Sequence, residues 1–235
     1  MLKKRIKTGP LSPSLTDRVY ERLFQAIATG EVPGETRLVA ASLARQLGVS
    51  ITPVRESLLR LAGENLVKPV PRVGYIVESM SATDLIDVFE ARIGVERLLA
   101  KMALEWITPA EVNFLEKNLE ESTDQLAQGK TDRMLELDTA FHQTIAQAAR
   151  NRTLVSVHQL LIKRTYRFRC ACLRVLNLAQ VTRDGHAEIV RAFLHRDGEE
   201  LDQAVLSHLG AVKDGVVVYL EQLRQEAMEP ASVSL

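Results

Sequence analysis

The stretch LARQLGVSITPVRESLLRLAGENLV, residues 43–67, has the pattern of two short helices joined by a tight turn. Gly48 supplies the turn, because glycine adopts left-handed backbone conformations at little steric cost. Ser50 or Thr52 can cap the second helix, and Pro53 is tolerated in its first turn, where no intrahelical donor is needed. The stretch therefore predicts a helix-turn-helix.

The chain behind this stretch loses its helical spacing. Asn65 lies where the second helix should stop, at a position that favours a left-handed residue. The segment KPVPRVGYIVES, residues 68–79, contains two prolines, a glycine and several β-branched residues, which break the helical period. It predicts a short β-hairpin with Arg72 and Gly74 near its tip. Such a hairpin would form a wing that approaches a phosphate or the minor groove.

Charge is distributed unevenly along the chain. The 235 residues have a formal net charge of zero, but residues 1–79 carry 12 Lys and Arg against 7 Asp and Glu, whereas residues 80–235 carry 18 against 23. A basic front and an acidic rear indicate that only the front meets a polyanion. In helix-turn-helix motifs the N-terminal end of the second helix enters the major groove, and here that end presents Ile51, Thr52 and Arg55.

The run GVSITPVRESLLRL, followed by a Pro-Arg-x-Gly hairpin, resembles the winged helix-turn-helix of the GntR superfamily of bacterial transcription regulators. The resemblance implies that Arg55 reads a base or a phosphate, that Thr52 contacts the DNA backbone, and that Gly74 lets the wing tip come close. The alternative for Arg55 is an ordinary solvated helix arginine. This chain departs from the family at Ile51, where arginine is usual, and at Ala40, where glutamate is usual. Ile51 removes an expected guanine reader and leaves the operator sequence undefined.

Helical patterns return after the hairpin and continue to the end of the chain. We expect about six helices in an all-helical bundle over residues 80–235, behind a winged helix-turn-helix domain over residues 1–79. The fold class is therefore mainly α. The expected helix starts are at Ser81, Thr108-Pro109, Thr131-Asp132 and Asn151, and the expected breakers are Gly129, Gly185 and Gly198.

Two charged residues project into an apolar stripe in the first helix of the rear part, around residues 82–105. Arg92 and Glu96 lie in the middle of this stripe. A buried charge costs several kcal/mol unless it is paired. We therefore expect the two residues to pair with each other, with another helix or with a ligand. His158 lies near the apolar side of a later helix, and we expect it to line an interior cavity with the inward-facing polar residues of this part.

Three histidines and an aspartate also project inward. Asp138 and His142 are four residues apart, so both side chains can reach one point, and His186 and His208 are each centred among apolar residues. His195 projects outward and should be solvated. A single inward histidine is more often an ordinary core residue than a ligand. Three of them with an aspartate suit Zn, Ni, Mn or Fe with open coordination positions.

This spacing resembles the FCD ligand-binding domain of the FadR branch, closest to its metal-binding members. The features shared are a D-x-x-x-H pair, a histidine 44 residues later and another 22 beyond it, behind a GntR-type winged helix. The resemblance implies that the metal ligands are Asp138, His142, His186 and His208. The family's F-E-A-R run is present as Phe89-Glu90-Ala91-Arg92, which makes Arg92 the candidate for gripping an effector carboxylate, beside Glu96 and His158.

We therefore expect a transcription regulator, usually a repressor in this family, that binds a double-stranded operator, a divalent metal and a small carboxylate effector. A homodimer is expected, because two recognition helices must lie about one DNA turn apart, ~34 Å. A metalloenzyme that activates water is an alternative, although no free acid or base is assigned to proton transfer. In a third reading the metal is purely structural. The chain has no apolar run of ~20 residues and no signal peptide pattern, so a cytoplasmic protein is expected.

Overall fold

The computed structural model describes residues 13–79, 81–130, 133–173 and 176–228. Contacts between residues divide the chain between positions 79 and 80 into two compact units. We call them the N-terminal unit and the C-terminal unit and describe each by itself.

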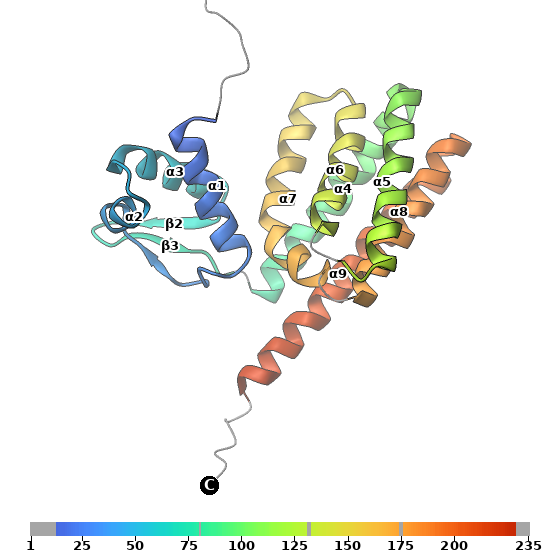
Figure 1. Cartoon of the computed structure of the whole chain (residues 1–235). Helices are drawn as coiled ribbons and strands as arrows, with labels where there is room; N and C mark the ends of the chain where they lie inside the picture. Colours follow the sequence, from blue (N-terminus) through green and yellow to red (C-terminus); the bar gives the residue numbers. More distant parts are fainter. Residues whose placement is uncertain (1–12, 80, 131–132, 174–175, 229–235) are drawn as a thin grey trace, which may run out of the picture. The chain divides into compact units, whose positions relative to one another are not determined.

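The N-terminal unit is a winged helix-turn-helix, which confirms the fold predicted for this part (Figure 1). Its sheet has the strand order β1-β3-β2, and both pairs are antiparallel. The predicted hairpin is present as β2 and β3, and the sequence did not predict the short strand β1 beside it. The elements are α1 Leu15–Ala28, β1 Arg37–Leu38, α2 Ala40–Leu47, α3 Ile51–Gly63, β2 Val67–Val70 and β3 Gly74–Val77.

Two left-handed residues delimit the helices of the motif. Gly48 ends α2 with a φ of 66°, and Asn65 follows α3 with a φ of 57°, as their positions predict. The N–H of Leu66 donates to the carbonyl of Leu61 at 3.0 Å, which completes the stop after α3. Of the two predicted capping residues, Ser50 occupies the N-cap position of α3 and Thr52 lies inside the helix. The side chain of Ser50 forms no capping hydrogen bond.

Helix α3 is fixed against α1 by its inner face. Leu58 and Leu61 are fully buried, and the hydroxyl of Ser57 donates to the carbonyl of Thr16 in α1 at 3.0 Å. The guanidinium of Arg60 lies 3.7 Å from the centre of the Tyr20 ring, a cation–π contact between the same two helices. These contacts fix the inner face of α3 against α1, while residues on its other face remain exposed.

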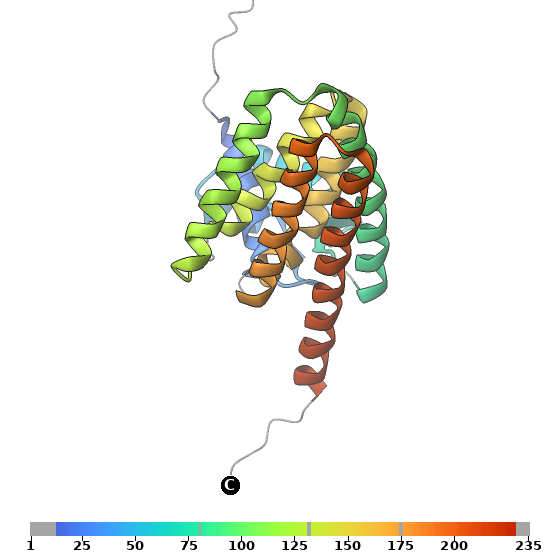
Figure 2. The ribbon, with the colours of Figure 1, turned by 90° about the vertical axis from the view of Figure 1, so that its right-hand side faces the viewer.

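The C-terminal unit is a bundle of six helices in the part of the chain that the structure describes (Figure 2). Helix α4 packs against α6, α7 and α9, and α8 packs against α5 and α9. The helices are α4 Ala82–Trp106, α5 Pro109–Ala127, α6 Met134–Ala148, α7 Arg152–Leu173, α8 Leu176–His195 and α9 Gly198–Met228. None of the described helices is long and apolar enough to cross a membrane.

Side chains cap the starts of three of these helices at predicted positions. Ser81 and Asp84 form a reciprocal capping box at α4, and Thr108 and Glu111 form another at α5. The side-chain oxygen of Asn151 accepts a hydrogen bond from the N–H of Leu154 at 3.1 Å. These caps satisfy backbone donors that have no partner within the helix.

The predicted breakers have different outcomes. Gly129 follows α5 in a left-handed conformation, with φ 67°, and Gly198 begins α9. Gly185 is not a breaker, because it lies inside α8. A Cβ at this position would lie 2.5 Å from Nδ1 of His208, so the glycine is needed for close packing of α8 on α9. The start predicted at residues 131–132 lies outside the described residues.

Candidate metal centre and DNA-binding surface

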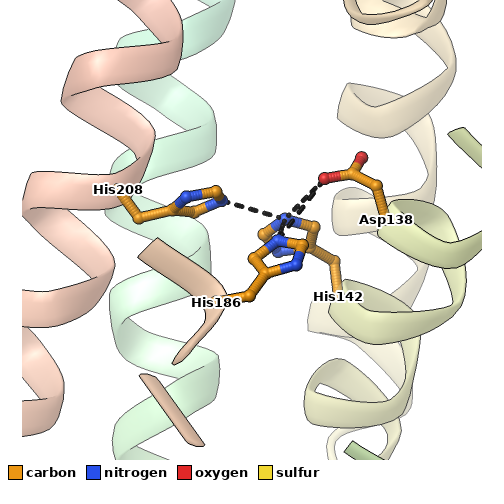
Figure 3. A group of neighbouring side chains, drawn as sticks. All are labelled: Asp138, His142, His186 and His208. Atoms are coloured by element: carbon orange, nitrogen blue, oxygen red, sulfur yellow. Dashed lines mark hydrogen bonds and ion pairs between the residues drawn. The ribbon is translucent and has the colours of Figure 1, made fainter. Parts of the chain in front are cut away.

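The structure brings the side chains of Asp138, His142, His186 and His208 together inside the C-terminal unit (Figure 3). Helix α6 supplies Asp138 and His142, α8 supplies His186, and α9 supplies His208. All four are buried, and each offers one ligand atom within 4.8 Å of the others. The four side chains, which come from three helices, thus meet at one place in the interior, as the helical projection predicted.

The spacing of the donor atoms fits one metal ion. Nε2 of His142 lies 3.3 Å from Nε2 of His186 and 3.3 Å from Nε2 of His208. Oδ1 of Asp138 lies 3.5 Å from Nε2 of both His142 and His186. Ligand atoms about 2.1 Å from a tetrahedral ion lie roughly 3.4 Å apart, and imidazole with carboxylate is a donor set that transition metals accept.

Glu96 joins His142 to Arg92. Nδ1 of His142 lies 2.6 Å from Oε2 of Glu96, and Nε of Arg92 donates to Oε1 of Glu96 at 2.5 Å. Burial alone would raise the pKa of Glu96, but Arg92 and His142 hold it well below its usual range. The ionised carboxylate faces Nδ1 of His142, and Nε2 of the same ring faces the donor cluster. Burial alone would lower the pKa of His142, but Glu96 and Asp138 raise it above its usual value.

Arg169 of α7 pairs with Asp138 as Arg92 pairs with Glu96. Arg169 was not identified from the sequence. Its Nε donates to Oδ2 of Asp138 at 2.9 Å, and its Nη2 donates to the same oxygen and, at 3.0 Å, to the hydroxyl of Thr139. Burial would raise the pKa of Asp138, but Arg169, His142 and His186 lower it well below its usual range. The signal was available: Arg169 follows His158 by eleven residues, three helical turns, and shares its face.

The other two histidines have environments that favour neutral rings. Burial is the largest effect on both: it lowers the pKa of His186 to about 4 and that of His208 well below its usual range. The ring of Phe141 stacks on His186, with centroids 3.9 Å apart. Neutral imidazole is the form that a metal ion binds, so these environments are compatible with a ligand role for both rings.

A small cavity borders the cluster. Its volume is about 10 Å³, room for about one water molecule. Glu96, His142 and His158 supply its polar lining. His158 is buried, with Nε2 3.5 Å from Oε1 of Glu96, and neither ring nitrogen forms a hydrogen bond with the described residues. Arg92 is not among the residues that line this cavity, and it donates to Glu96, which is. His195 is exposed and bound to Glu200, outside the cluster as predicted.

The N-terminal unit presents an exposed surface at the start of α3. Thr52 and Arg55 are exposed there, whereas Ile51 is half-buried. Arg55 forms no ion pair with any residue that the structure describes. Arg72 is exposed in the turn between β2 and β3. Its φ of 63° is one that residues other than glycine usually avoid.

The sheet gives Gly74 a role within the fold. It has a φ of 116°, and a Cβ there would lie 2.5 Å from the carbonyl oxygen of Leu38 in β1. Its lack of a side chain is therefore required for β1 to pair with β3, whatever the wing contacts. Arg37, which the sequence did not single out, donates from Nε to the carbonyl of Val73 at 2.8 Å and braces the hairpin.

Both units match known families. Residues 15–77 match the bacterial regulatory proteins of the gntR family, and residues 87–211 match the FCD domain. The HTH-type transcriptional repressor RspR of Escherichia coli is 26% identical over 218 residues, 93% of each chain. An uncharacterised HTH-type regulator of Bacillus subtilis, YdhC, is 31% identical over 137 residues, 57% of this chain and 61% of that one.

Solved structures share the fold. McbR/YncC of E. coli superposes with a TM-score of 0.73 at 24% identity, covering 90% of this chain and 99% of its own. A GntR-type regulator of a Rhodococcus species gives 0.70 at 19% identity, covering 86% and 97%. The families and the named relatives are transcriptional regulators, which excludes the metalloenzyme alternative. The chain is a DNA-binding transcription regulator and belongs to the GntR family, with an FCD domain behind its winged helix.

Proposed function

We propose that the protein is a repressor whose C-terminal unit binds one divalent transition metal and a small carboxylate effector, and that the effector changes operator binding. The observation that carries the proposal is the convergence of four buried donor atoms within 4.8 Å. The ligands are Asp138, His142, His186 and His208, and the metal is Zn, Ni, Mn or Fe. A bound metal with open positions would supply a coordination site for one carboxylate oxygen.

The polar residues beside the cluster support an acidic effector. Glu96 and His158 line the cavity, and the buried guanidinium of Arg92 is held by Glu96. A guanidinium binds a carboxylate by charge-assisted hydrogen bonds and has five N–H donors, so Arg92 can bind an effector carboxylate in addition to Glu96, which takes its Nε. Neither ring nitrogen of His158 forms a hydrogen bond with the described residues, and Nδ1 offers one to such a ligand.

The size of the cavity gives a route from binding to regulation. A volume of about 10 Å³ is too small for a metabolite of several carbons, so binding requires movement of the helices that carry the lining residues. In a homodimer such movement would alter the spacing of the two recognition helices, which must match one DNA turn of ~34 Å. An effector shifts that equilibrium only as far as its affinities for the two spacings differ.

The proposal is tested with the full-length protein, chelated and then reloaded with one metal at a time. An operator is first selected from random duplex DNA. Acetate, lactate, succinate and citrate are then titrated at fixed salt. We expect at least one acid to raise the melting temperature and to change operator affinity tenfold or more, only in the loaded protein.

Two results contradict the proposal. If no metal is retained, the ligand set is wrong. If chelation unfolds the C-terminal unit and no acid shifts its melting temperature, the metal is purely structural. The His195→Ala variant is the control and should retain its metal, because His195 is exposed and lies outside the cluster.

A further inference from the structure

Asp138 meets the donor cluster with only one of its two oxygens. Oδ2 accepts hydrogen bonds from Nε and Nη2 of Arg169, and Arg169 is itself buried. Oδ1 faces Nε2 of His142 and Nε2 of His186, 3.5 Å from each. Arg169 therefore fixes the rotation of the carboxylate and limits Asp138 to one ligand atom.

The second buried carboxylate beside the cluster is paired in the same way. Glu96 accepts from Nε of Arg92 at 2.5 Å, and both side chains are buried. Each carboxylate, Asp138 as well as Glu96, thus has its own buried arginine. A buried carboxylate without such a partner is strongly destabilising.

This pairing separates the centre from a typical structural metal site. In sites where binding and folding are one event, the metal ion neutralises the ligand charges, and the protein without it is unfolded. Here the arginines perform that neutralisation from within the protein. This pairing gives the bundle a way to bury Asp138 without the ion.

We propose that Arg169 is a positioning residue that holds Asp138 in place and compensates its charge in the absence of metal, so that the metal enters and leaves a folded site. The centre is then an exchangeable site that responds to metal supply. The metal part of this inference rests on the proposed function, whereas the part about folding without metal does not.

The experiment compares melting temperatures of the full-length protein in excess EDTA and with one equivalent of Zn²⁺. The wild type should remain helical at 25 °C in EDTA, by circular dichroism. Arg169→Met should melt on the order of 10 °C lower in EDTA, because Asp138 is left buried and unpaired. With Zn²⁺ the deficit should shrink, since the ion supplies the missing charge, so the zinc-induced shift should exceed that of the wild type.

Two further variants make the test specific. Arg169→Met combined with Asp138→Asn should recover most of the melting temperature in EDTA, because the unpaired charge is gone, although a metal ligand is lost. Arg191→Met is the matched control: Arg191 is an exposed arginine paired with Glu200, and its zinc-induced shift should equal that of the wild type.

Several outcomes overturn the inference: unfolding of the wild type in EDTA, an equal zinc-induced shift in Arg169→Met and wild type, or no recovery in the double variant. Failure of the proposed function gives a different result. If elemental analysis finds no bound zinc in the wild type, the metal site is refuted, and the EDTA series still decides the role of Arg169.

Discussion

Gly185 of α8 lies directly against the ring of His208 in α9: a Cβ at position 185 would be 2.5 Å from Nδ1 and 2.9 Å from Cβ of that histidine. A helix interior ordinarily disfavours glycine by about 1 kcal/mol relative to alanine. At this position the close approach of the two helices excludes any side chain. The packing of α8 on α9 and the placement of a candidate ligand therefore depend on the same glycine.

We expect Gly185→Ala to displace His208, to lower zinc affinity at least tenfold and to destabilise the fold by about 1–3 kcal/mol through overpacking. Calorimetric zinc titration and urea unfolding measure the two effects. The matched control is Gly210→Ala in α9, where a Cβ would meet nothing within 4 Å. Gly210→Ala should leave zinc affinity unchanged, and equal behaviour of the two variants would contradict the argument.

His186→Ala and His208→Ala should each reduce bound metal from about one ion per chain to a trace, since each removes one of four donor atoms. Loss of a residue that only supports a ligand costs about 10–100-fold in affinity, and loss of a ligand should cost at least as much. Elemental analysis after gel filtration measures the content. His195→Ala should keep its metal, and a parallel loss in all three variants would refute the assignment.

Arg92→Met should abolish the shift in melting temperature that an effector acid produces. The structure adds a complication, because this variant leaves Glu96 with one partner fewer in a buried place. We therefore pair it with Arg92→Met/Glu96→Gln, which removes the unpaired charge and should regain stability while the response stays absent. A response that persists in both variants would mean that the metal alone holds the acid.

Arg55→Ala should weaken operator binding by ~1–3 kcal/mol if the side chain reads a base, without altering the melting temperature. Its exposed position in α3 and its lack of an ion pair with the described residues leave the guanidinium available for DNA. Fluorescence anisotropy at two salt concentrations separates base reading from a phosphate contact. If Arg55 contacts a phosphate, its removal should make operator affinity depend less steeply on salt. Lys101→Ala, at an exposed position in the C-terminal unit, is the control. Equal operator affinity of Arg55→Ala and the wild type would mean that Arg55 is only solvated.

The capping box at α5 should make stability fall in acid. Burial alone would raise the pKa of Glu111, but hydrogen bonds from Thr108 and the charge of Arg150 lower it. A lowered carboxyl pKa stabilises the folded state above the unfolded value of about 4.3 and stops doing so as the pH falls through the folded value. Melting curves from pH 6 to pH 3 should therefore show a smaller decline for Glu111→Gln than for the wild type, and identical slopes would contradict this.

Local sequence signals predicted much of the fold and most of the candidate centre. Gly48 and Asn65 indicate turns because few residues adopt left-handed conformations readily. The helical spacing predicted that His142, His186 and His208 face the interior, where they meet. Whether they bind a metal stays a prediction. Such signals are strong because they depend only on neighbours along the chain.

The features missed depend on contacts between distant segments. Strand β1 has two residues, too few for a period, and forms only by pairing with β3. Gly185 looks like a breaker until α9 is in place beside it. Arg169 resembles any helix arginine unless its face is compared with that of His158, eleven residues earlier.

Glu96 contacts two neighbours with different oxygens, Arg92 through Oε1 and His142 through Oε2. An acid that binds Arg92 would change the charge around a carboxylate whose other oxygen contacts a candidate ligand ring. Thermodynamic reciprocity then requires that the factor by which metal changes affinity for the acid equals the factor by which the acid changes affinity for metal. If the metal strengthens binding of the acid, the acid must therefore strengthen binding of the metal by the same factor.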